Sequence, residues 1–226
     1  SRYVSESFGI RYHAKSQILI SVGVSEALDL ALRAIINPGD EIIYHEPCYV
    51  SYAPGISLAH GVPVPVPCLA ENDFAVTAEA IEQVITPQSK ALVLNFPTNP
   101  TGGTMTYDAL ERIVDLVKKH NLLVITDEIY SELTFEGEHV SIAALPGMAE
   151  RTIFLHGFSK AYAMTGFRIG YACGPPELID AMMRIHQYSM LCASIISQDA
   201  AIEALENGAG PAEEMKDEFR IRRNYI

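Results

Sequence analysis

A stretch of small and apolar residues from Gly157 to Arg168 contains one lysine, Lys160. A lysine is usually a solvated surface group. Loss of water around an amine favours its neutral form, and a neutral amine attacks aldehydes. Arg168, at the end of the same stretch, could supply a fixed positive charge for a phosphate. The segment therefore predicts a nucleophilic lysine beside an anion-binding arginine.

An acidic residue, Asp127, ends an apolar run that extends from Leu122 to Thr126. Burial of a carboxylate is costly unless the group is paired, so we expect Asp127 to face a cation. That cation is either a protonated ring nitrogen of a ligand or the side chain of an arginine. The sequence pattern leaves both alternatives open.

Three other positions carry groups that suit a phosphorylated aromatic ligand. At Val24 and Ser25 a small-residue turn enters a helix, where backbone N–H groups and the Ser25 hydroxyl could bind a phosphate. Alternatively, Ser25 is an ordinary helix N-cap. Tyr49 offers a ring on which a flat heterocycle could stack, although simple packing explains it equally well. Asn99 lies in a loop of proline, threonine and glycine that either aims its amide at a ligand or only forms a tight turn.

Short apolar runs rich in β-branched residues alternate with patterns of helical spacing along most of the chain. The predicted strands are Ile18 to Val22, Glu41 to Tyr44, Ala91 to Phe96, Leu122 to Thr126, Thr152 to Leu155 and Ile169 to Cys173. The predicted helices are Ser25 to Ile36, Thr77 to Ile85, Tyr107 to His120 and Glu177 to Met190, with Thr77 and Thr106 as N-caps. This alternation favours a largely parallel sheet with helices on both faces, whose ligands bind beyond the carboxyl ends of the strands. The proline-rich run Val62 to Pro67 is expected to be an edge strand or a connection.

Composition excludes several classes of partner. The chain has 226 residues, of which 49% are hydrophobic, so one domain with a sizeable core is expected. A net charge of −12 argues against nucleic acid or an anionic membrane as a partner. No signal sequence or bilayer-spanning run is visible, so we expect a cytoplasmic protein. The histidines and cysteines lack metal-ligand spacing, so no metal site is expected, and the cysteines are expected to be reduced, packed thiols: Cys48, Cys68, Cys173 and Cys192.

Four segments of the chain, in this order, resemble the class I/II aminotransferases, which are fold-type-I pyridoxal-phosphate enzymes. They are Ser21 to Leu28, Pro97 to Gly103, Asp127 to Tyr130 and Ser159 to Gly170. Each motif alone is weak, but the four together are specific and span nearly the whole chain. The resemblance implies an α/β fold: a three-layer αβα large domain around a mainly parallel, mixed sheet of seven strands.

The resemblance also implies roles for individual residues around the cofactor, pyridoxal 5'-phosphate. Lys160 would hold it as a Schiff base and move the proton at the substrate α-carbon. Asp127 would pair with the ring nitrogen, and Tyr49 would stack on the ring. Asn99 and Tyr130 would hydrogen-bond its phenolic oxygen. The phosphate would be held by Val24, Ser25 and Arg168.

Two positions depart from the pattern of this family. Many relatives carry serine or threonine where this chain has Gly157, so Ser159 is a candidate for part of the phosphate contact. Relatives often carry tryptophan where Phe167 stands. Neither difference removes a group that the chemistry needs.

The implied function is transfer of an amino group between an amino acid and a 2-oxo acid by a homodimer. Family members are longer, with an N-terminal segment and a C-terminal small domain that supplies the arginine for the substrate carboxylate. Residues 1–226 are therefore expected to be the cofactor-binding large domain, a fragment of a longer protein.

Three alternatives remain open from the sequence. The same cofactor could serve another reaction, such as β-elimination at a carbon–sulfur bond, because fold and cofactor do not fix reaction type. The chain could instead be the effector-sensing domain of a transcription regulator built on this scaffold. Finally, Gly23 to Ala27 approaches the nucleophile elbow of serine hydrolases but lacks its final glycine.

Overall fold

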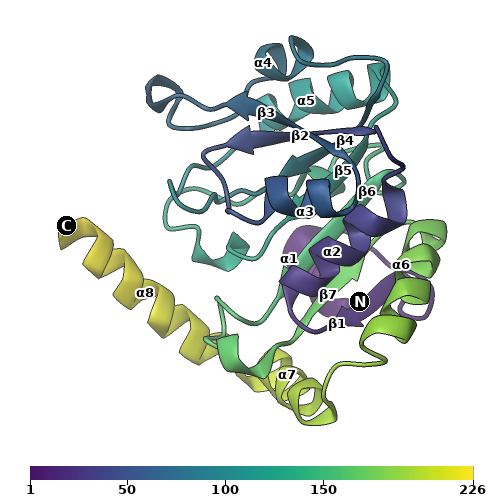
Figure 1. The fold of residues 1–226 in the computed structure, drawn as a ribbon. Helices are drawn as coiled ribbons and strands as arrows, with labels where there is room; N and C mark the ends of the chain where they lie inside the picture. The colour runs from purple at the N-terminus through teal and green to yellow at the C-terminus, as the bar shows by residue number, and fades with distance from the viewer. Residues whose placement is uncertain (226) are drawn as a thin grey trace.

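The computed structural model describes residues 1–225, which form one seven-stranded sheet with helices packed on both faces (Figure 1). The strands are β1 (Ile18–Ser21), β2 (Glu41–Glu46), β3 (Val62–Pro67), β4 (Ser89–Leu94), β5 (Leu123–Asp127), β6 (Thr152–Gly157) and β7 (Gly170–Cys173). The helices are α1 (Arg2–Phe8), α2 (Val24–Ile35), α3 (Tyr52–Leu58), α4 (Ala78–Glu82), α5 (Tyr107–Lys119), α6 (Pro176–Ser189), α7 (Ile195–Asn207) and α8 (Ala209–Tyr225).

The sheet is mainly parallel, as predicted, with the strand order β1-β7-β6-β5-β4-β2-β3. Strands β2 to β6 pair in parallel, whereas β7 is antiparallel to both of its neighbours, β6 and β1. Because two reversals restore the direction, β1 points the same way as β6. The carboxyl ends of β1, β2, β4, β5 and β6 therefore meet at one edge of the sheet, and β7 begins there.

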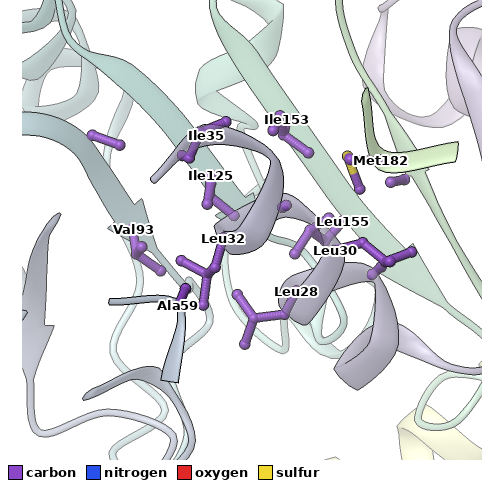
Figure 2. Close-up of a cluster of buried hydrophobic side chains, with 14 of the residues drawn as sticks. Leu28, Leu30, Leu32, Ile35, Ala59, Val93, Ile125, Ile153, Leu155 and Met182 are labelled. Atoms are coloured by element: carbon purple, nitrogen blue, oxygen red, sulfur yellow. The ribbon is translucent and has the colours of Figure 1, made fainter. Parts of the chain in front are cut away.

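Side chains alternate across the sheet and create a core on each face. On one face, α2 and α6 cover β6 and its neighbours, and Leu30, Leu32, Ile153 and Leu155 are buried between the layers (Figure 2). Phe154 points to the opposite face, where α1 and α7 pack. Helices α4 and α5 cover the remainder of that face. The αβα prediction is thus confirmed.

Local sequence chemistry fixes the start of two of these helices. The Thr77 hydroxyl accepts a hydrogen bond from Ala80 N at 3.2 Å, and the Thr106 hydroxyl accepts one from Ala109 N at 3.3 Å. Both N-cap predictions are confirmed. A side chain that accepts from the first turn satisfies an amide that the helix itself leaves without a partner.

Strand β3 lies at the end of the sheet and pairs only with β2, so the edge-strand alternative is correct for Val62–Pro67. Prolines at positions 63, 65 and 67 lack the N–H that a second neighbouring strand would require. This sequence blocks further strand pairing at that edge.

The C-terminal helices were not predicted from the sequence. Helix α8 has no buried residue and projects from the body of the molecule after α7 (Figure 1). Near its end, Arg223 pairs with Glu136 at 2.7 Å. The loop before α7 leaves Cys192 exposed, so the expectation of packed thiols is wrong for that cysteine, while Cys68 and Cys173 are buried. Within residues 1–225, no helix combines the length and apolarity needed to cross a membrane.

Candidate active site

A pocket of about 260 Å³ opens at the edge where the strands end. This volume lies just below the ~300–1,000 Å³ range typical of small-molecule sites. The pocket collects all nine site residues that the sequence predicted. We call it the strand-end pocket, and it is lined by Val24, Ser25, Leu28, Tyr49, Asn95, Asn99, Asp127, Ile129, Tyr130, Ser159, Lys160, Thr165 and Arg168.

One end of the pocket is formed by the first turn of α2. Its N-cap is Gly23, and the first intrahelical bond runs from Ala27 N to Gly23 O at 3.4 Å. The amides of Val24 and Ser25 precede that bond and have no partner within the helix. Ser25 is the second helical residue, so its interpretation as an ordinary N-cap is wrong. The amides, with the helix dipole, form a site suited to an anion.

The guanidinium of Arg168 lies against this helix terminus. Gly23 has φ of 78°, and a Cβ at that position would lie 2.6 Å from an Arg168 guanidinium nitrogen. Only glycine combines this backbone conformation with so close an approach. The guanidinium also donates a hydrogen bond to Thr165 O at 3.0 Å, which fixes its direction. Arg168 is exposed on its other side and can bind a ligand oxygen.

The structure explains why Gly157 replaces the hydroxyl residue of many relatives. A Cβ at Gly157 would lie 2.9 Å from the Val24 side chain and 3.0 Å from Gly170 Cα. A serine or threonine would therefore crowd the Val24 side chain and the backbone at the start of β7. Ser159, two residues later, is half-buried in the pocket lining. It places a hydroxyl in the pocket without a side chain at position 157.

Asp127 lies at the floor of the pocket, with only 6% of its surface exposed. Its Oδ1 accepts a hydrogen bond from Ile129 N at 3.2 Å, and its Oδ2 accepts one from Tyr52 Oη at 3.0 Å. Burial raises the pKa of Asp127 to about 6, although both hydrogen bonds oppose the rise. Within residues 1–225 no salt bridge involves Asp127, so the arginine-pairing alternative is not observed.

The amine of Lys160 lies above the ring of Tyr130, with 5.5 Å between Nζ and the ring centroid. Lys160 is half-buried, and no carboxylate pairs with it in the described part of the chain. The Tyr130 hydroxyl in turn accepts a long hydrogen bond, 3.5 Å, from Asn99 Nδ2. An amine, a phenol and an amide are thus neighbours on one wall of the pocket.

Two residues near the pocket were missed by the sequence analysis. Asn95 Nδ2 donates to Asp127 O at 2.7 Å, and Asn95 Oδ1 accepts from Asn99 N at 3.3 Å. Asn95 directly follows β4, so the strand-end rule could have found it. Tyr52 carries no such signal, because it lies within α3 and is known only by its contact with Asp127.

The pocket brings together three kinds of group: an amine, a buried carboxylate and an anion-binding helix terminus. A ligand that has an aldehyde, a basic ring nitrogen and a phosphate would find a partner for each. By contrast, the pocket lining within residues 1–225 includes no histidine, so Ser25 lacks the base of a Ser-His-Asp triad. The hydrolase alternative therefore has no support.

Comparison with known proteins agrees with this arrangement. A family described as "Aminotransferase class I and II" matches residues 1–226, and the chain belongs to this family. Members of the family depend on pyridoxal phosphate. The chain is 49% identical over 226 residues to a protein of Bacillus subtilis (strain 168) named "Putative aminotransferase YugH".

Solved structures share the fold as well. The aromatic aminotransferase from Pyrococcus horikoshii OT3 superimposes with a TM-score of 0.97 at 37% identity over 99% of this chain. The aspartate aminotransferase from Thermus thermophilus, in a structure with maleate, gives a TM-score of 0.95 at 38% identity over 99% of this chain. The chain spans 58% of YugH and of the Thermus enzyme, and 61% of the Pyrococcus enzyme.

Proposed function

We propose that residues 1–226 are the pyridoxal-phosphate-binding large domain of a longer aminotransferase. The complete protein would transfer an amino group between an amino acid and a 2-oxo acid. The observation that carries this proposal is the strand-end pocket, which joins the Lys160 amine, the Asp127 carboxylate and the anion-binding start of α2. The length of the matched relatives supports the domain assignment, because this chain spans only about 60% of them.

Each group has a part of the cofactor that it suits. Lys160 binds the aldehyde covalently. Asp127 pairs with the ring nitrogen, and Asn99 and Tyr130 hydrogen-bond the phenolic oxygen. Tyr49 lies against the ring face. The phosphate is bound by the amides of Val24 and Ser25, the hydroxyls of Ser25 and Ser159, and the Arg168 guanidinium.

Once bound, pyridoxal phosphate supplies an electron-withdrawing ring that stabilises negative charge at the substrate α-carbon. The chain supplies the proton chemistry. Lys160 Nζ, once the substrate amine has displaced it from the aldehyde, would be free to take the proton from that carbon as a general base and to return it as a general acid. Asp127, as a carboxylate, keeps the ring nitrogen protonated. Tyr49, in the pocket lining, would shield one face of the ring from water.

The covalent role of Lys160 is tested by borohydride reduction of the full-length protein loaded with pyridoxal phosphate. We expect the cofactor to become attached to the peptide that contains Lys160, and the Lys160→Ala variant to lose both the label and more than ~10²-fold of the activity. Exposed Lys15 provides the matched control, since Lys15→Ala should behave as the wild type. Label on a different peptide would refute the assignment.

Reaction type needs a separate assay of the full-length protein. An aminotransferase exchanges the amino group when supplied with an amino acid and a 2-oxo acid. A carbon–sulfur lyase would instead release ammonia and pyruvate. An effector domain would catalyse neither of these reactions. The similar solved structures are named aromatic aminotransferase and aspartate aminotransferase. The screen should therefore include both aromatic amino acids and aspartate as donors.

We also propose that the protein is a homodimer. Support comes from exposed apolar side chains at the end of α6, in the loop that follows and at the start of α7: Tyr188, Met190, Leu191, Ile195 and Ile196. Exposed apolar side chains that gather in one segment are typical of protein–protein contacts.

A further inference from the structure

A tyrosine outside the pocket lining, Tyr52, reaches the buried carboxylate of the candidate site. It lies at the start of α3, has 0% exposure, and its Oη lies 3.0 Å from Asp127 Oδ2. Burial and the neighbouring Asp127 raise the pKa of Tyr52 well above its ordinary value. Tyr52 therefore stays a phenol at any physiological pH and donates this hydrogen bond.

We propose that Tyr52 is a positioning residue that holds the Asp127 carboxylate ionised and oriented toward the strand-end pocket, so that Asp127 can capture the cationic ring of the cofactor. The inference rests on the proposed function, in which Asp127 pairs with the ring nitrogen. It adds Tyr52, a residue outside the pocket lining, to the groups that cofactor binding requires.

The surroundings of Asp127 explain why a donor is needed. Burial is the largest influence on this carboxyl and raises its pKa to about 6. The hydrogen bond from Tyr52 is the largest opposing influence, followed by that from Ile129 N. Of the charged neighbours, Glu128 raises the pKa and His156, on β6, lowers it, both less strongly. Tyr52 thus does most to keep Asp127 ionised near neutral pH.

Tyr52 also contacts a second residue of the site. Its ring meets the Tyr49 ring edge-on, with 5.9 Å between centroids and an interplanar angle of 81°. A phenylalanine would keep this ring contact and lose only the hydroxyl. Tyr52→Phe therefore isolates the hydrogen bond from the packing.

The test measures the dissociation constant of pyridoxal phosphate from the apo form of the full-length protein between pH 6 and pH 9. Loss of one hydrogen bond to a charged group changes its proton affinity about tenfold or more. We expect Tyr52→Phe to raise the dissociation constant about fivefold or more at pH 6, where about half of the wild-type Asp127 is already protonated. The ratio of the variant and wild-type dissociation constants should approach one at pH 9, where Asp127 is ionised even without the Tyr52 hydrogen bond.

Tyr44→Phe is the matched control. Tyr44 is 4% exposed and donates to Glu46 Oε1 at 2.7 Å, so Tyr44→Phe also removes a tyrosine hydroxyl bonded to a carboxylate, without touching Asp127. Its affinity for the cofactor should equal that of the wild type at every pH. A Tyr52→Phe variant with unchanged affinity, or with a loss that is constant from pH 6 to pH 9, would overturn the inference.

Asp127→Asn separates this inference from the function on which it rests. If Asp127→Asn weakens cofactor binding and Tyr52→Phe does not, the role of Tyr52 fails alone. If neither variant weakens binding, the proposed pairing of Asp127 with the ring nitrogen fails as well.

Discussion

Asp127 is the residue on which the chemistry and the stability of the fold make opposite demands. A buried carboxylate without a cation costs free energy, and here burial raises its pKa from 3.8 to about 6. The folded chain therefore holds a proton that the unfolded chain has already released between these two pH values. The free energy of unfolding falls as pH rises through this window, by about 3 kcal/mol.

Asp127→Asn should remove this pH dependence. In urea unfolding of the apo full-length protein, we expect the variant to exceed the wild type by about 2–3 kcal/mol at pH 7.5 and to match it near pH 4, where both carry a neutral group. Asp115→Asn, on the exposed face of α5, should follow the wild type throughout. Equal free energies of unfolding for the wild type and Asp127→Asn at pH 7.5 would contradict this prediction.

The reversed strand β7 decides the geometry of the site at the level of elements. Since β7 runs antiparallel to β6, the connection between them stays at one edge of the sheet and delivers both Lys160 and Arg168 to the pocket. The β1–α2 turn arrives at the same edge and meets Arg168 at Gly23. The phosphate end of the pocket therefore depends on a glycine between two elements.

Gly23→Ala should weaken binding of the phosphate specifically. Its Cβ would displace the Arg168 guanidinium, so we expect the dissociation constant of pyridoxal phosphate to rise at least tenfold, while that of pyridoxal, which lacks the phosphate, changes little. Both constants can be measured by absorbance titration of the apo protein.

Gly9→Ala is the control for a side chain placed at a positive φ, although ψ is 10° at Gly9 and 167° at Gly23. Gly9 has φ of 71°, and a Cβ there would meet nothing within 4 Å. The substitution costs about 1 kcal/mol of stability and should leave cofactor affinity unchanged. Equal losses of affinity for pyridoxal and pyridoxal phosphate in Gly23→Ala would argue against the phosphate role.

Elements with a strong hydrophobic pattern were predictable from the sequence, and elements without one were not. The buried strand β5 and the amphipathic α5 were each placed to within about two residues, because burial leaves a clear periodicity. Helix α3 contains Pro54 and Gly55, which disfavour helix, and forms through packing of Tyr52 and Ile56 in the core. Helix α8 has no buried face to leave a pattern.

The candidate site shows the same limit. Residues at or just beyond the end of a strand, such as Asp127 and Lys160, could be found because parallel strands end at a common edge. Tyr52 could not, because its contact with Asp127 joins α3 to β5 and depends on how the helix packs. A single sequence contains no local sign of that pairing.

The whole molecule exposes apolar side chains that a monomer would leave in water. Tyr188 is 88% exposed, Leu191 78% and Ile196 73%, in one segment that runs from the end of α6 to the start of α7. Burial of such side chains contributes roughly 1.5–3 kcal/mol each. This segment is the surface that we expect a second copy of the chain to cover.

A double substitution, Leu191→Asp with Ile196→Asp, should convert the dimer into a monomer in sedimentation velocity experiments on the full-length protein. Two buried, unpaired charges would cost the interface several kcal/mol. Leu69→Asp, at a position 49% exposed after β3, should leave the dimer intact. A dimer that persists in the double variant would place the interface elsewhere.

The pairing of β1 with β7 also bears on how the protein is synthesised. Strand β1 is the first strand of the sheet in chain order, and its neighbour β7 is the last. A nascent chain that ends before Arg168 lacks both the cation and the strand that hold the start of α2 in place. The pocket proposed to bind the cofactor is therefore complete only once β7 has been translated, so we expect cofactor binding to follow folding of the sheet.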